Sequence, residues 1–176
     1  YFEQNYPLIK REEYKTSRLS ETEKKILCEK GFPITEYMPP FLQSFNISAE
    51  SSIYLEGFPD YIVIGYDEWD MPVCVNKKGE IVTGIDGEEE FFVNSSIECL
   101  FACLAVYMSY ADRLKETDEM NIPVSERLEQ SEILEKERRR VVRALRNELK
   151  QIDSKALADP DYPWAFHLEE LEEGIL

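Results

Sequence analysis

Four short strand signals follow one another so closely along the chain that no helix fits between them. They cover residues 52–56, 61–66, 72–76 and 80–85 and are rich in β-branched and aromatic residues. Parallel strands need a crossover of about a dozen residues, whereas three to five residues separate these strands. The sequence therefore predicts antiparallel pairing. The β-branched run at 62–64 predicts a central strand buried on both faces.

Helix signals precede and follow these strands. Ser20 and Glu23 fit a capping box and Gly31 fits a stop signal, which predicts a helix over residues 20–30. Within the strand region, Gly79 follows two lysines and is available for a positive φ, as a hairpin connection requires.

The segment 91–96 (FFVNSS) has the pattern of a short strand that runs into a helix. Asn94 or Ser95 is expected to cap this helix, and Ser95 with Glu98 fits a second capping box. Apolar residues at helical spacing extend it to about residue 115 and predict that it packs against the sheet. Two further helices are predicted, a long charged one at 125–152 and a final one at about 167–173 with Gly174 at its end. The first half of the long helix has few apolar residues, so we expect it to project into solvent or to touch a partner.

Charge is concentrated in two parts of the chain. The 176 residues carry a net charge of −16, and residues 50–98 alone have 12 acidic and 2 basic side chains, a net charge of −10. The tail from 153 to 176 adds −6. Direct binding to nucleic-acid phosphates or to anionic lipid is not expected from such a balance. The basic run at 136–140 lies among glutamates (Glu132, Glu135 and Glu148) at helical pairing distance, which predicts a solvated, ion-paired surface.

Catalytic and metal-binding patterns are absent from the sequence. The one histidine, His167, is expected to be anchored in the packing of the tail, and Glu88, Glu89 and Glu90 stand in a Gly/Asp-rich turn where all three would be solvated. Asp67, Glu68, Asp70 and Asn76 offer calcium-type oxygens without the order of an EF-hand. We assign no catalytic residue, no cofactor and no metal.

Cysteine usage and the lack of targeting segments predict a cytoplasmic protein. Cys28, Cys74, Cys99 and Cys103 form no C-x-x-C pair and are expected to be free thiols. The longest apolar run has nine residues (100–108), too few to span a membrane, and no secretory signal pattern opens the chain.

Several short motifs, taken in order, resemble the SUKH superfamily of bacterial immunity proteins, which is related to the yeast Smi1/Knr4 cell-wall regulator. They are "EKGFP" at 29–33, "YIVIGYD" at 61–67, "PVCVNKKGEIV" at 72–82, "FFVNSSIECLFACLAVY" at 91–107, and Ile152-Asp153 followed by Trp164, Leu168 to Leu171 and Gly174. The resemblance covers about residues 20–110 and 145–174.

The resemblance implies an α+β fold, a mainly antiparallel sheet of about four to six strands with helices packed against it. We expect a single SUKH-like domain over 1–176. The charged helix at about 116–144 is not a feature of the family core and is either a lineage-specific insertion or a dimer contact. The oligomeric state, monomer or homodimer, stays open.

The resemblance also implies a non-enzymatic protein that binds and blocks a cognate toxin domain, often a nuclease. A basic nuclease would be steered to a concentrated acidic face. The candidate contacts lie in two strand connections: Asp67, Glu68, Trp69 and Asp70 in the first, and Asp86, Glu88, Glu89 and Glu90 in the second. Trp69 is either exposed or folded back over the core. A Smi1/Knr4-like interaction scaffold and an acidic DNA mimic remain as alternative functions, as does an unrecognised enzyme or ligand-binding module.

Overall fold

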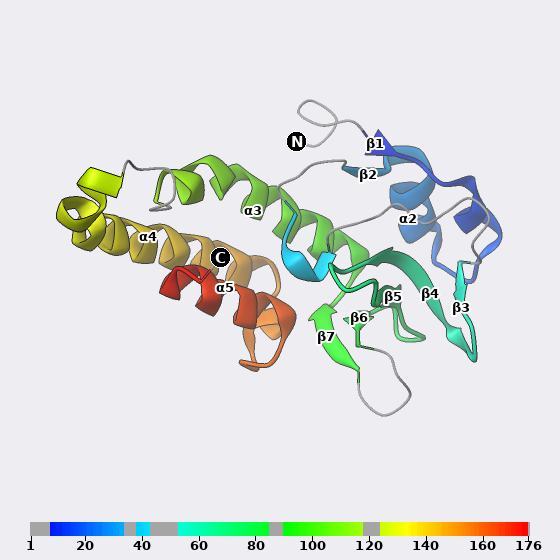
Figure 1. Cartoon of the computed structure of the whole chain (residues 1–176). Helices are drawn as coiled ribbons and strands as arrows, with labels where there is room; N and C mark the ends of the chain where they lie inside the picture. The colour runs from blue at the N-terminus through cyan, green and yellow to red at the C-terminus, as the bar shows by residue number, and fades with distance from the viewer. Residues whose placement is uncertain (1–7, 34–37, 43–52, 85–89, 118–123, 176) are drawn as a thin grey trace.

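A computed structural model describes residues 8–33, 38–42, 53–84, 90–117 and 124–175 (Figure 1). Its main sheet has five strands in the order β3-β4-β5-β6-β7, and every neighbouring pair is antiparallel. The strands are β3 (Tyr54–Leu55), β4 (Phe58–Tyr66), β5 (Pro72–Val75), β6 (Ile81–Thr83) and β7 (Phe91–Asn94). The predicted antiparallel α+β class is therefore confirmed.

The strand β4 is the buried strand that the sequence predicted. Ile62 and Ile64 have no exposed surface and Val63 has 2%. The tight connection between β5 and β6 is also as expected, since Gly79 has a φ of 82°. Asn76 completes this connection, because its Oδ1 accepts from the backbone N–H groups of Lys78 and Glu80 at 2.9 and 3.1 Å. The amide oxygen of Asn76 is thus engaged in a turn.

A smaller N-terminal unit packs beside β4. It pairs β1 (Leu8–Ile9) with β2 (Phe32–Pro33) and contains α2 (Glu21–Lys24) with a following π-helical turn (Lys25–Lys30). The capping box of Ser20 and Glu23 is present, and Gly31 ends the helix with a φ of 84°. The helix boundaries were predicted correctly, whereas the π-type hydrogen bonding of its second half was not. Tyr14 joins this unit to the sheet, because its hydroxyl donates to the Val63 carbonyl at 2.8 Å.

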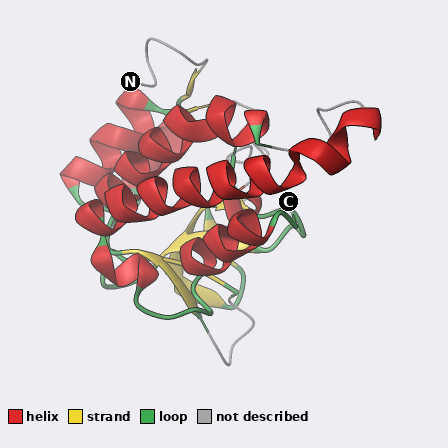
Figure 2. Ribbon diagram, turned by 90° about the vertical axis from the view of Figure 1, so that its left-hand side faces the viewer, coloured by secondary structure: helices red, strands yellow, loops and turns green. Residues whose placement is uncertain are grey.

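Three longer helices complete the fold, and Figure 2 shows them layered over the sheet. They are α3 (Ile97–Glu116), α4 (Val124–Ile152) and α5 (Pro163–Glu173). Helices α3 and α4 lie side by side, and α5 lies along the C-terminal half of α4 (Figure 1). Leu100, Leu104, Val141, Val142 and Leu145 are fully buried in the shared core. No helix in the described part of the chain is both long and apolar enough to cross a membrane.

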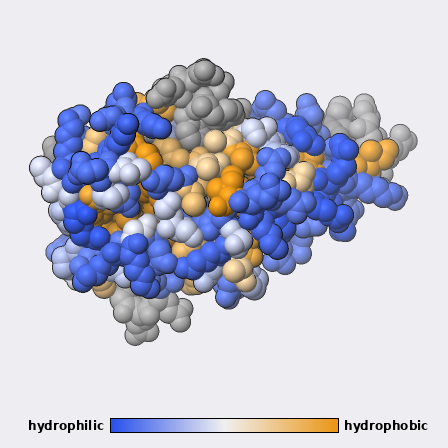
Figure 3. All heavy atoms as spheres, turned by 180° about the vertical axis from the view of Figure 1, so that it is seen from behind, coloured by the Kyte–Doolittle hydropathy of each residue, from blue (hydrophilic) through white to orange (hydrophobic). Residues whose placement is uncertain are grey.

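The first half of α4 extends beyond the core, as its sparse apolar residues predicted (Figure 1). Ile133 is 69% exposed there. On the face seen in Figure 3, apolar side chains gather near the middle of the molecule and hydrophilic ones lie around them. Ion pairs run along the helix, as expected: Lys136 with Glu132 at 2.8 Å and Arg139 with Glu135 at 2.6 Å. Glu148 instead accepts a hydrogen bond from the Tyr110 hydroxyl.

The predicted cap of α3 was wrong. Ser96 is the N-cap, and its side chain accepts from the Cys99 N–H at 3.2 Å. Asn94 and Ser95 are drawn instead to the carboxylate of Asp153, which is 5% exposed. Asp153 accepts from Ser95 N and Oγ at 2.7 and 2.9 Å and from Asn94 Nδ2 at 3.1 Å. A buried carboxylate needs several donors, and that need overrides the local capping pattern.

Helix α5 begins four residues earlier than predicted. Pro163 occupies its first turn, where the missing N–H has no cost, and Gly174 ends the helix in the left-handed region as expected. The earlier start places Trp164 on the buried side of the helix with no exposed surface. Phe41 and Tyr107 pack edge-on against the indole at centroid distances of 4.9 and 5.8 Å.

Candidate binding site

Trp69 is the most exposed large apolar side chain of the candidate site, at 72%. It stands in the connection between β4 and β5, which is held by hydrogen bonds within the turn and by one to Pro40. Asp67 Oδ1 accepts from the N–H groups of Trp69 and Met71 at 2.9 and 2.8 Å, and Glu68 N donates to the Pro40 carbonyl at 3.1 Å. Of the two alternatives for Trp69, the exposed one is therefore correct, and the turn presents the indole to solvent.

Beside Trp69 lies a pocket of about 290 Å³ that the sequence did not predict. Its walls are mainly apolar. Phe91 at the start of β7 and Phe166 of α5 are 39% and 53% exposed and line it together with Trp69. Phe41 and His167 belong to the buried aromatic cluster around Trp164 and also line it. The pocket thus joins four segments that are separated in the sequence.

Four carboxylates surround these aromatic walls: Asp67, Glu68, Asp161 and Glu170. None of them forms an ion pair with a lysine, arginine or histidine in the described part of the chain. Other surface carboxylates do find such partners, for example Glu80 with Lys155 at 2.7 Å. The pocket therefore combines exposed aromatic surface with negative charge that no basic side chain among the described residues neutralises.

His167 is 3% exposed and is anchored in the tail packing, as the sequence predicted. Its Nε2 lies 3.0 Å from the Tyr107 hydroxyl, and its Nδ1 is buried with no hydrogen-bond partner among the described residues. Burial lowers the pKa of the imidazole from 6.5 to about 4. At neutral pH the ring is consequently uncharged.

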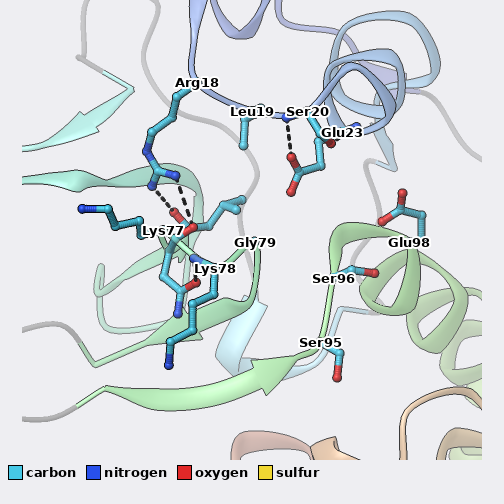
Figure 4. A pocket seen from close by; sticks show the side chains of 12 residues that line it. Arg18, Leu19, Ser20, Glu23, Lys77, Lys78, Gly79, Ser95, Ser96 and Glu98 are labelled. Carbon is cyan, nitrogen blue, oxygen red and sulfur yellow. Dashed lines mark hydrogen bonds between the residues drawn. The ribbon is translucent and has the colours of Figure 1, made fainter.

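A second pocket, of about 450 Å³, is polar and is shown in Figure 4. Two of its charged side chains, Arg18 and Glu23, are already committed to the fold. Arg18 donates to the carbonyls of Asn76 and Val75, each at 3.3 Å, and to that of Asp60. Glu23 closes the capping box by accepting from Ser20 N at 2.6 Å. The ends of the neighbouring elements are joined by these contacts, so we assign this pocket a structural role.

The remaining predicted contact residues lie around the first pocket or outside the described residues. Asp70 is exposed and follows Trp69 with a φ of 61°. Glu90 is exposed next to Phe91 and accepts from the Tyr61 hydroxyl at 2.9 Å. Asp86, Glu88 and Glu89 lie outside the residues that the structure describes. The structure thus brings Asp67, Glu68 and Trp69 together in one pocket wall.

Sequence reasoning missed the other side of this pocket. Asp161, Phe166 and Glu170 come from the acidic tail, about a hundred residues after Trp69. The aromatic residue Phe166 within an acidic tail was a usable signal for a contact surface. No local pattern, however, indicated that the tail returns to the β4–β5 connection.

Metal and thiol chemistry find no support in the described residues. No group of three or more His, Cys, Asp or Glu side chains within them is arranged to hold a metal ion. Cys28, Cys74, Cys99 and Cys103 are free. Burial raises the pKa of both Cys74 and Cys103 to about 12, so that these two remain protonated thiols at neutral pH.

Comparison with known proteins gives a family match. Neither a curated protein nor a solved structure matches the chain. The model of one family, described as SUKH-4 immunity protein, matches residues 5–170 and so includes the main sheet and most of α5. The chain belongs to the SUKH-4 immunity protein family, within the superfamily that its motifs resemble.

Proposed function

We propose that the protein binds and neutralises a nuclease toxin domain of a polymorphic or contact-dependent toxin system. Membership of an immunity protein family supports a toxin immunity role. The proposed binding site rests on the exposed indole of Trp69, which stands beside an apolar pocket. The carboxylates of this pocket have no basic partner within the described chain. Exposed aromatic residues next to a pocket are the usual anchors of protein interfaces.

Charge supports a basic partner. Residues 50–98, which include the β4–β5 connection, carry a net charge of −10. A nuclease must carry positive charge where it holds the phosphates of its substrate. An acidic inhibitor is attracted to that surface and can occlude it, which raises the association rate and the specificity.

The proposed interface extends along two strand connections. Asp67, Glu68, Trp69 and Asp70 contribute the first, and Asp86, Glu88, Glu89 and Glu90 the second. Trp69 supplies the apolar anchor, and the carboxylates around it supply the attraction. The protein acts by binding in the cytoplasm of the producing cell, without a cofactor or chemical step of its own.

The test is capture of the toxin from a lysate of the source organism, or of the product of the adjacent gene, followed by a growth assay. We expect stoichiometric recovery of a basic nuclease domain, and survival of cells that express both proteins. Trp69→Ala should weaken the complex, whereas Ile133→Ala, which alters another exposed apolar residue, should not. Recovery of cell-wall or signalling enzymes, with no toxin gene nearby, would favour the Smi1/Knr4-like scaffold instead. A toxin complex that Trp69→Ala leaves unchanged would place the interface elsewhere.

A further inference from the structure

We propose that the pocket beside Trp69 receives the guanidinium group of a single arginine of the toxin, so that this arginine is an anchor of the complex. The inference rests on the proposed function for the identity of the partner. The chemistry of the pocket itself can be tested without that partner.

The walls of the pocket suit a flat cation. Trp69, Phe91 and Phe166 expose ring surface to it, and a guanidinium group stacks on aromatic faces while retaining its charge. A purely apolar side chain would also contact these rings. It would, however, cover the neighbouring carboxylates without giving them a hydrogen bond or a counter-charge, which is unfavourable.

The carboxylates supply the acceptors. Asp67 Oδ1 is occupied by two backbone donors of its own turn, so the open acceptors are chiefly Glu68, Asp161 and Glu170. They come from two separate segments that line the pocket, the β4–β5 connection and the tail. Arginine has five donors in a planar fork and can serve acceptors on more than one side, whereas lysine presents a compact point charge.

His167 adds a further polar group to the lining of the pocket. Its buried Nδ1 has no hydrogen-bond partner among the described residues, although the ring lines the pocket. With the imidazole proton on Nε2, donated to the Tyr107 hydroxyl, Nδ1 is left as an acceptor. The ring is neutral at pH 7 and does not repel a guanidinium group.

The direct test uses N-acetyl-arginine amide and its uncharged isostere N-acetyl-citrulline amide as probes of the free protein. The chain has two tryptophans, so its indole N–H groups give two separate NMR signals. We expect the arginine probe to shift the signal of exposed Trp69 more than that of buried Trp164, with half-saturation on the order of millimolar. Citrulline amide should give at least about tenfold weaker binding. Equal shifts with both probes, or no shift with arginine, would overturn the inference.

A matched pair of variants separates local charge from net charge. Asp161→Asn with Glu170→Gln neutralises two carboxylates of the pocket, and Asp112→Asn with Glu116→Gln makes the same change on the exposed surface of α3. Only the first pair should weaken arginine-probe binding. Equal weakening by both pairs would show general attraction and overturn the assigned pocket.

The same variants distinguish failure of this inference from failure of the proposed function. With the captured toxin, the pocket pair should lower affinity by about tenfold or more, as expected for a buried anchor. A toxin complex that the pocket pair leaves intact would keep the immunity function and reject the arginine anchor. Probe binding at the pocket without any captured toxin would support the site and reject the toxin as its partner.

Discussion

Trp164 Nε1 donates a hydrogen bond of 2.9 Å to Asn94 Oδ1, and neither side chain has any exposed surface. The bond links the first turn of α5 to the last residue of β7, 70 positions apart in the sequence. Asn94 also bonds to a third element, because its Nδ2 donates to Asp153 just after the end of α4. One buried amide therefore fixes the tail against the sheet and so sets the position of the α5 residues that line the pocket.

Asn94→Ala should lower the free energy of unfolding by about 2–4 kcal/mol, because it leaves the Trp164 N–H without an acceptor and removes one donor from Asp153. Trp164→Phe removes the other partner and should cost about 1–3 kcal/mol. Urea unfolding of both single variants and of the double variant gives the coupling free energy between Asn94 and Trp164, which we expect to be at least about 1 kcal/mol. Strictly additive effects would show that the bond contributes little.

Truncation of Trp164 should mainly reduce stability, whereas truncation of Trp69 should mainly reduce toxin binding. Trp164→Ala empties a fully buried site and should cost about 3–5 kcal/mol of unfolding free energy, whereas Trp69→Ala alters an exposed side chain and should stay within about 0.5 kcal/mol. Binding to the toxin should show the reverse order when it is measured on folded protein. Thermal unfolding and calorimetric titration on the same preparations check both halves, and a large stability loss from Trp69→Ala would contradict the exposed position.

Acid should destabilise the fold through His167. Burial lowers its folded pKa to about 4, below the value of 6.5 in the unfolded chain, so the unfolded state binds the proton more tightly between these values. The free energy of unfolding that depends on neutral His167 is fully present above about pH 6.5. It decreases as the pH falls below this value, by about 2 kcal/mol at pH 5.

Urea unfolding at pH 7.5 and pH 5 measures this loss, and His167→Gln is the comparison because it removes the titrating ring. The carboxylates titrate in both proteins, so the difference between the two pH slopes reports His167 alone. We expect the variant to be less stable at pH 7.5 and to have a flatter slope. Identical slopes would contradict the lowered pKa.

Charge reversal of Glu88, Glu89 and Glu90 to lysine should slow association with a basic toxin by about tenfold or more and flatten the salt dependence of the rate. Folding should change little, since the sequence predicts that all three glutamates are solvated, and solvated charges contribute little stability. Reversal of Glu29, Asp112 and Glu116, which are exposed on other elements, gives the same change in net charge. Stopped-flow or surface-based kinetics at several salt concentrations separate the two triples. Equal rates for both would reject this face as the one that attracts the toxin.

Much of the fold was determined by local sequence. The short spacings between strands left antiparallel pairing as the only solution, and β4 is buried along residues 62–64 because a β-branched run fills both faces of the sheet. Ser20, Glu23, Gly31, Gly79 and Gly174 set helix ends and a turn as predicted, since at these positions neighbouring residues alone satisfy the cap or the positive φ. The exposed part of α4 follows in the same way from its lack of an apolar stripe.

Tertiary contacts decided the remainder. Asn94 and Ser95 have good local capping chemistry, but the buried carboxylate of Asp153, 58 residues after Ser95, takes their donors and moves the cap to Ser96. The sequence did not determine whether Trp69 is exposed, because a tryptophan between two acidic residues is compatible both with an exposed turn and with packing at the edge of the core. Only the return of α5 to the β4–β5 connection creates the pocket. That return depends on long-range packing around Trp164 and on its hydrogen bond to Asn94, which no local pattern encodes.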